Sequence, residues 1–215
     1  MNIHEVTVID YGVGNILSVQ RGLEYFGAKV IVTADPKIIL TAKRIVLPGV
    51  GAFDNAMKNL KRLNLISVIH EVAKQKIPLL GICLGMQLLL DESEEFGITA
   101  GLGLIPGRVI SVPNYTVSGI KQKIPHIGWN IIQPSNIDLG WQKTLLENNV
   151  KKEAMYFVHS FMAVPFDPKH RIADCLYGGH KITAMIAKDN IIGCQFHPEK
   201  SGEAGLKILR KFILQ

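Results

Sequence analysis

Cysteine is scarce in this sequence, and long apolar runs and basic clusters are missing. The 215 residues include three cysteines, an odd number without metal-ligand spacing, which argues against a disulfide framework and a cysteine-ligated metal. No apolar run reaches the roughly 18 to 20 residues that span a bilayer. The chain does not open with a basic segment followed by an apolar one, so no secretion signal is expected. We therefore expect a cytoplasmic protein with reduced thiols, no membrane contact and no metal or other cofactor.

The charge of the chain gives little support to nucleic-acid binding. The formal net charge is +6, but lysines and arginines are scattered and are not interleaved with aromatic residues. This distribution is typical of a solvated surface. A basic face would also suit a partner that handles phosphorylated substrates. No nucleic-acid partner is predicted.

Length and hydrophobicity predict a single α/β domain over residues 1–215. At 47% hydrophobic residues, the chain can bury one substantial core. In the first half, strand patterns alternate with helix patterns, which implies βαβ crossovers and a mostly parallel sheet with helices on both faces. The expected strands are residues 6–10, 29–33, 44–47 and 78–82, and the expected helices are residues 16–26, 53–62, 66–75 and 84–90.

The second half of the chain changes character. Strands are expected at residues 108–112, 155–159, 182–187 and 191–196, with few helices between them and a closing helix at 205–214. Such a series of strands predicts a mixed or antiparallel extension of the sheet. Residues 114–150 show no clear pattern and are expected to form loops.

A cysteine stands where a buried strand is expected to turn into a helix. Residues 81–85 read Gly-Ile-Cys-Leu-Gly. A nucleophile at such an elbow needs glycine on both sides, because its backbone is strained and the helix passes close to the strand. At the start of a helix, Cys83 is also in a position that favours thiolate over thiol. The pattern indicates a nucleophile, although taken alone it also fits a small buried apolar residue.

A histidine and a glutamate follow another expected strand near the C-terminus. His197 and Glu199 flank Pro198, whose fixed torsion suits a rigid turn. A cysteine nucleophile needs a base, and an imidazole base needs an acceptor that holds its tautomer. His197 and Glu199 can fill these two roles, and a surface turn with a charged pair is the other interpretation. Cys175 and Cys194 are expected to be structural.

The elbow and the Phe-His-Pro-Glu segment at 196–199 together resemble the triad-type glutamine amidotransferases. Their catalytic cysteine, histidine and glutamate match Cys83, His197 and Glu199. Further segments narrow the resemblance to the glutaminase subunit of imidazole glycerol phosphate synthase, from histidine biosynthesis; they are residues 9–15, 47–53, 101–107, 125–130 and 156–160. The resemblance implies a class I glutamine amidotransferase-like fold. One departure is Pro-Gly-Val-Gly at 48–51, where other members usually carry Pro-Gly-Gly.

The resemblance also assigns a reaction and a substrate site. Glutamine is hydrolysed to glutamate and ammonia, with the thiolate attacking the side-chain amide carbon. The N–H groups of Val50 and Leu84 would stabilise the oxyanion, and the peptide of Val50 is expected to flip when the partner binds its ligand. The remaining matched positions, which would bind glutamine, are Gly51, Gln87, Ser160 and Phe161.

A partner is implied because ammonia is mostly protonated in neutral water and this chain carries no synthase domain. The resemblance implies a heterodimer with a separate (β/α)8 cyclase subunit, which uses ammonia to make imidazole glycerol phosphate and an aminoimidazole carboxamide ribotide. The residues that match interface positions are Asn15, Trp129, Tyr156 and Lys200. Core packing of Trp129 and a solvated Lys200 are the alternatives. His126 and His159 are expected to be hydrogen-bonded structural histidines.

Other functions remain open at the level of sequence. A paralogous glutaminase could supply ammonia to a sugar-modifying enzyme of surface-polysaccharide biosynthesis, and a catalytically silent regulatory subunit is a second alternative. An independent cysteine peptidase would explain only the triad. The Gly12-Val13-Gly14 segment resembles the start of a dinucleotide fingerprint, but Leu17 occupies the position of the third glycine.

Overall fold

The computed structural model describes residues 4–136, 140–147 and 153–215. Within these residues, a nine-stranded sheet has the order β2-β1-β3-β4-β13-β12-β11-β8-β9. Its parallel half consists of β1 (Glu5–Ile9), β2 (Lys29–Thr33), β3 (Ile45–Leu47), β4 (Leu79–Ile82) and β13 (Ile191–Cys194). The large mixed sheet, parallel in this half and flanked by helices, confirms the predicted class I glutamine amidotransferase-like α/β fold class.

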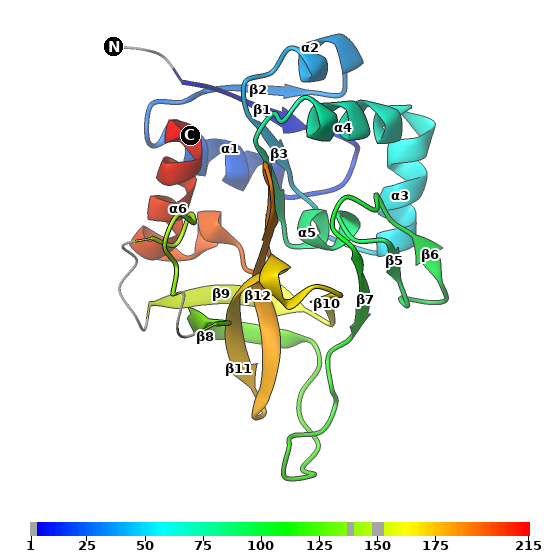
Figure 1. The fold of residues 1–215 in the computed structure, drawn as a ribbon, viewed down its shortest axis with the longest axis vertical. Helices are drawn as coiled ribbons and strands as arrows, with labels where there is room; N and C mark the ends of the chain where they lie inside the picture. Colours follow the sequence, from blue (N-terminus) through cyan, green and yellow to red (C-terminus); the bar gives the residue numbers. More distant parts are fainter. Residues whose placement is uncertain (1–3, 137–139, 148–152) are drawn as a thin grey trace.

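Helices cover both faces of the parallel half (Figure 1). On one face lie α1 (Ile16–Glu24) and α6 (Gly202–Leu214), whose apolar side chains join one core cluster. On the other lie α2 (Pro36–Leu40), α3 (Phe53–Arg62) and α4 (Leu65–Lys74), which join a second cluster. In α3 the buried residues are Phe53, Ala56, Met57 and Leu60. This spacing places them on one side of the helix, so burial of an apolar stripe holds it against the sheet.

The second half of the chain extends the sheet by antiparallel pairing, as predicted. Four strands continue it beyond β13, namely β12 (His180–Lys188), β11 (Arg171–Tyr177), β8 (His126–Pro134) and β9 (Ala154–His159). A separate four-stranded sheet contains β5 (Glu92–Ser93), β6 (Thr99–Ala100), β7 (Gly107–Ser111) and β10 (Phe161–Pro165). Short 3-10 turns occur at η1 (Pro168–His170) and η2 (Pro198–Lys200), and η2 leads into α6.

Several sequence expectations need correction. Residues 114–150 are not all loop, because β8 occupies nine of them; residues 137–139 and 148–150 of that segment lie outside the described residues. In β8 the alternate residues Ile127, Trp129 and Ile131 are exposed, so the strand has period two but shows its apolar side chains to solvent. Its pairing with β9 and β11 is distant in sequence and is invisible to a local pattern. The strands β10 and β11 and the short helix α2 were also missed.

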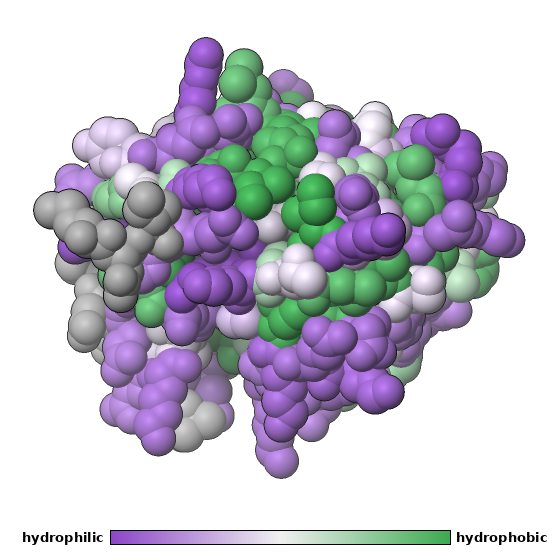
Figure 2. Space-filling view, turned by 90° about the horizontal axis from the view of Figure 1, so that it is seen from above, coloured by the Kyte–Doolittle hydropathy of each residue, from purple (hydrophilic) through white to green (hydrophobic). Residues whose placement is uncertain are grey.

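The surface beside α2 and α4 is mixed in polarity. Seen from above, hydrophilic residues surround a narrow apolar band (Figure 2). Among the described helices, none has the length and apolar character needed to cross a bilayer. The cytoplasmic location and the single-domain boundary stay predictions of the sequence.

The turn at residues 81–85 brings α5 (Leu84–Leu88) very close to the sheet. A Cβ atom added to Gly85 would lie 1.8 Å from the carbonyl oxygen of Leu47, and one added to Gly81 would lie 2.6 Å from the carbonyl oxygen of Gly85. Both neighbours are backbone atoms, which cannot move aside as a side chain can. The predicted need for glycine on both sides of Cys83 is therefore explained by steric contact.

We predict that Gly85→Ala destabilises the protein by about 3 kcal/mol or more, because α5 must separate from β3. Gly119→Ala is the matched control: its positive φ of 81° is unfavourable for alanine, but the added Cβ meets nothing within 4 Å, so a loss of only about 1 kcal/mol is expected. Urea unfolding of both variants measures the difference. Equal losses would contradict the steric explanation.

Candidate active site

Cys83 occupies a strained turn between β4 and α5. Its φ of 55° and ψ of −109° are unusual for a residue with a side chain. The Cys83 N–H donates to the carbonyl oxygen of Cys194 on the neighbouring strand at 2.7 Å. Because β3, β4 and β13 are adjacent and parallel, the segments that follow them meet at one edge of the sheet. These segments carry residues 48–51, Cys83 and His197.

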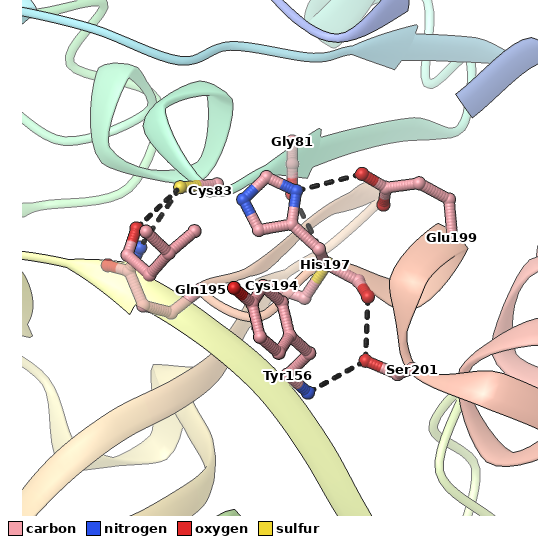
Figure 3. Close-up of polar contacts among 9 residues, drawn as sticks. Gly81, Cys83, Tyr156, Cys194, Gln195, His197, Glu199 and Ser201 are labelled. Carbon is pink, nitrogen blue, oxygen red and sulfur yellow. Dashed lines mark hydrogen bonds and ion pairs between the residues drawn. The ribbon is translucent and has the colours of Figure 1, made fainter. Parts of the chain in front are cut away.

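His197 and Glu199 form a buried pair beside Cys83. The distance from His197 Nδ1 to Glu199 Oε1 is 2.8 Å, and the two side chains are 3% and 0% exposed. Figure 3 shows the imidazole between Cys83 and Glu199, with its second ring nitrogen turned toward the sulfur. That nitrogen, Nε2, is buried and has no hydrogen-bond partner among the described residues. The arrangement is that of a nucleophile, a base and an orienting carboxylate.

The surroundings of His197 favour its charged form. Burial lowers its pKa, but hydrogen bonding and charge interactions with Cys83 and Glu199 outweigh burial and raise the pKa from 6.5 to about 10. His197 is therefore protonated at neutral pH and can give a proton to a leaving group.

Backbone contacts hold the histidine in place. The His197 N–H donates to the carbonyl oxygen of Tyr156 at 2.9 Å. The hydroxyl of Ser201 donates to the carbonyl oxygen of His197 at 2.6 Å and accepts from the N–H of Tyr156 at 2.9 Å (Figure 3). Strand β9 and the start of α6 thus fix the turn that carries His197.

A pocket of about 280 Å³ opens beside Cys83. This volume is near the lower end of the range for small-molecule sites. Seven of the sequence-predicted site residues line it: Val50, Gly51, Cys83, Leu84, Gln87, Ser160 and Phe161. Segments that are far apart in sequence therefore converge on one cavity, with Cys83 in its wall.

The two expected oxyanion donors are not both turned to the site. The Leu84 N–H donates to the carbonyl oxygen of Gly49 at 3.3 Å. In a trans peptide the C=O and the following N–H point in opposite directions, so the Val50 N–H points away from Leu84. We call residues 48–51 the oxyanion loop. In this structure the Gly49 carbonyl oxygen accepts from the Leu84 N–H, which is the donor that an oxyanion would need.

Contacts from neighbouring segments support this state of the oxyanion loop. The hydroxyl of Tyr11 donates to the carbonyl oxygen of Pro48 at 2.7 Å. The Tyr11 side chain is fully buried, and burial raises its pKa well above the usual range. A Cβ atom on Gly49 would lie 2.6 Å from the Tyr11 oxygen. The loop therefore rests against Tyr11, and glycine is needed for that contact.

The predicted glutamine-binding residues use their polar groups in different ways. The amide nitrogen of Gln87 donates to the carbonyl oxygen of Phe161 at 3.0 Å and to Gln195 Oε1 at 2.9 Å. The Phe161 side chain packs against the core, so its backbone is the part that can face a ligand. The carbonyl oxygen of Ser160 accepts from the Val112 N–H at 2.9 Å.

Two polar residues of the site were missed by the sequence analysis. Glu95 lines the pocket, and its carboxylate accepts from the Phe53 N–H at 2.6 Å. Gln195 is completely buried, and its amide nitrogen lies 3.7 Å from the Cys83 sulfur. The expected strand at 191–196 was a usable signal for Gln195, which stands two residues before His197, but the structure ends β13 at Cys194, so the two side chains do not share a strand. No local signal marks Glu95.

The predicted interface residues lie close to the site. Trp129 is 57% exposed, which excludes the alternative of core packing. It pairs with Tyr156 across β8 and β9, and their ring centroids are 5.9 Å apart. Lys200 is exposed on η2, and Asn15 precedes α1, which contacts η2.

His126 and His159 are hydrogen-bonded structural residues, as expected. His126 Nδ1 lies 2.9 Å from His159 Nε2, and His159 Nδ1 lies 2.8 Å from the carbonyl oxygen of Phe161. Burial lowers the pKa of His126 to about 4 and that of His159 to about 3. Both rings are neutral at physiological pH.

Comparison with known proteins gives the same picture as the geometry. A family model described as glutamine amidotransferase class-I matches residues 7–215. The chain belongs to this family. It is 52% identical to imidazole glycerol phosphate synthase subunit HisH 1 of Legionella pneumophila (strain Lens), over 97% of this chain and 98% of the relative. It is 45% identical to the HisH subunit of Geobacter sulfurreducens, over 97% of each chain.

Solved structures of the family share the fold. A glutamine amidotransferase crystal structure superposes with a TM-score of 0.73 at 14% identity and covers 97% of each chain. The structure of PurLQS from Thermotoga maritima superposes with a TM-score of 0.68 at 20% identity, covering 98% of this chain and 97% of that chain. At these identities the likeness concerns the fold alone.

We predict that Glu199→Gln lowers the pKa of His197 from about 10, because the carboxylate charge is lost. The folded pKa of His197 lies above its ordinary 6.5, so its contribution to stability is complete below pH 6.5 and is lost as the pH rises through 10. Unfolding free energy should therefore fall more steeply between these pH values in the unaltered chain than in Glu199→Gln. NMR titration of the His197 ring checks the pKa directly, and a midpoint near 6.5 in the unaltered chain would contradict the assignment.

Proposed function

We propose that this chain is the glutaminase subunit of imidazole glycerol phosphate synthase. Cys83, His197 and Glu199 hydrolyse glutamine, and the ammonia passes to a separate (β/α)8 cyclase subunit that makes imidazole glycerol phosphate and an aminoimidazole carboxamide ribotide. The observation that carries the proposal is the buried His197–Glu199 pair, 2.8 Å apart and facing a cysteine in the wall of the pocket. Relatives named HisH at 44–52% identity over nearly the full length support the choice of synthase.

The chemistry follows from the charges of the site. The Cys83 thiolate, beside the protonated His197, attacks the side-chain carbonyl carbon of glutamine. The imidazolium then protonates the departing nitrogen, which leaves as ammonia and gives a thioester. His197 next accepts a proton from water, which attacks the thioester and releases glutamate and free Cys83. Glu199 keeps Nδ1 protonated throughout.

The oxyanion of each tetrahedral intermediate needs N–H donors. In the resting loop the Leu84 N–H is bonded to the Gly49 carbonyl oxygen and the Val50 N–H points away. Rotation of the Gly49–Val50 peptide would free the Leu84 N–H and turn the Val50 N–H to the site. One such donor contributes about 3 kcal/mol to transition-state stabilisation. The contact between Leu84 and Gly49 at 3.3 Å therefore supports a resting state of low activity, which partner binding relieves.

The pocket suits the polar ends of glutamine. Glu95 provides a carboxylate for the α-ammonium group, and the backbone near Gly51, Ser160 and Phe161 lies at the same cavity. Because the amide nitrogen of Gln87 is used by Phe161 and Gln195, the Gln87 oxygen is the atom left to accept from a substrate N–H.

The partner surface lies on the exposed side of β8 and β9. Ile127, Trp129 and Ile131 are each at least 51% exposed and follow one another on alternate positions of β8. Tyr156 lies opposite Trp129, and its backbone holds His197. A partner bound here would contact Tyr156, whose carbonyl oxygen accepts from the N–H of the catalytic histidine. Asn15 and Lys200 would extend the same interface.

Glutamate release from glutamine tests the proposal. The chain alone is expected to be slow, and addition of the host's cyclase subunit with its ribulosyl ligand is expected to stimulate it strongly. Cys83→Ala should lower kcat by roughly 10,000-fold or more in every mixture. Basal activity that this pair does not change would point to a polysaccharide-pathway paralogue, and no activity in any mixture would point to a silent subunit.

A second prediction concerns the interface. We expect Trp129→Ala to weaken binding of the cyclase subunit about thirtyfold, since a central exposed tryptophan is a typical hot spot, while leaving glutamate release by the isolated chain unchanged. Ile38→Ala, which alters an apolar residue 38% exposed on α2, away from β8 and β9, is the control and should bind normally. Titration calorimetry measures both affinities. Equal affinities for the two variants would remove Trp129 from the interface.

A further inference from the structure

The amide of Gln195 points at the nucleophile. Its nitrogen lies 3.7 Å from Cys83 Sγ, and the whole side chain is buried. Figure 3 shows this nitrogen directed at the sulfur, on the side away from the imidazole. A sulfur atom accepts a hydrogen bond more readily as a thiolate than as a thiol, because charge strengthens the bond.

The direction of the amide is fixed by a neighbouring carbonyl group. The carbonyl oxygen of Phe161 can only accept, so the atom of Gln87 that faces it at 3.0 Å must be the nitrogen. The same nitrogen lies 2.9 Å from Gln195, which must therefore present its oxygen to Gln87. Consequently the nitrogen of Gln195 is turned to Cys83, and the sulfur receives a donor.

Two histidines, hydrogen-bonded in series, hold the Phe161 carbonyl group in place. His159 Nδ1 faces it at 2.8 Å and must carry hydrogen there, so His159 Nε2 accepts from His126 Nδ1 at 2.9 Å. His126 Nε2 then accepts from the Asn130 amide at 2.7 Å. Each contact in the series from Asn130 to Cys83 pairs a donor with an acceptor, which gives the Gln195 amide one stable orientation.

We propose that Gln195 is a catalytic residue that stabilises the thiolate of Cys83, and that Gln87 is a positioning residue that keeps the Gln195 nitrogen on the sulfur. The inference rests on the proposed role of Cys83 as nucleophile. A thiol at Cys83 can donate to the Val158 carbonyl oxygen, 3.9 Å away, but a thiolate has no proton for this contact. The Gln195 N–H remains as a donor to the negative sulfur.

Alkylation of Cys83 by iodoacetamide as a function of pH tests the proposal in the isolated full chain. The Cys83 peptide is quantified by mass spectrometry, so Cys175 and Cys194 do not interfere. In Gln195→Met the midpoint of the alkylation profile is expected to rise by about one pH unit, because a charge-assisted hydrogen bond to the thiolate is lost. Gln87→Met should shift it in the same direction by less.

Thr183→Val is the matched control. Thr183 is fully buried on β12 with no hydrogen-bond partner for its hydroxyl, so this change replaces a buried polar group near Gln195 without touching the sulfur. Its alkylation midpoint should equal that of the unaltered chain. If Gln195→Met does not fold, as judged by circular dichroism, Gln87→Met carries the test, since it leaves Gln195 in place.

An unchanged midpoint in folded Gln195→Met, or an equal shift in Thr183→Val, would overturn the role of Gln195. This readout uses neither glutamine nor a partner, so it separates the two proposals. A shifted midpoint in a chain that never releases glutamate would overturn the proposed glutaminase function and leave the thiolate contact standing. Normal glutamate release together with an unchanged midpoint in Gln195→Met would overturn the role of Gln195 and leave the glutaminase function standing.

Discussion

The close approach of α5 to the parallel sheet is the constraint on which the site depends. With the Leu47 carbonyl oxygen only 1.8 Å from where a Cβ of Gly85 would lie, helix and strand are as near as two backbones can be. This approach forces Cys83 into its strained turn and places the oxyanion loop, which directly follows β3, against the start of α5. The nucleophile and the groups that would stabilise its intermediates are therefore set by one steric contact.

The same sheet edge brings the base to the nucleophile. Because β13 pairs with β4 in parallel register, the residues that follow the two strands emerge side by side, and His197 needs only a short turn to face Cys83. Tyr156 and Ser201 then fix that turn from the antiparallel side of the sheet. Tyr156 also lies opposite the exposed Trp129, so the strands proposed to face the partner and the proposed base His197 belong to one hydrogen-bonded framework.

Electrostatics divides the buried histidines into two groups. His197 has an anionic neighbour on each side when Cys83 is ionised, and its pKa rises to about 10. His126 and His159 are buried among neutral donors and acceptors, and their pKa values fall. Burial alone would lower all three, so the sign of the shift is decided by the charges in contact. Neutral rings keep fixed donor directions, which is what the amides of Gln87 and Gln195 require.

The sequence by itself determined the fold class, the elbow and the triad candidates, because these depend on local patterns: strand and helix periods, glycines at fixed spacing, and His-Pro-Glu after a strand. It did not determine β8 or β11, whose pairing is between distant segments, nor Glu95, whose position is set by the small sheet. Tertiary structure alone decided that the Leu84 N–H is taken by Gly49 and that Gln195 donates to Cys83. Peptide and amide directions are chosen by neighbours in space, and no residue type encodes them.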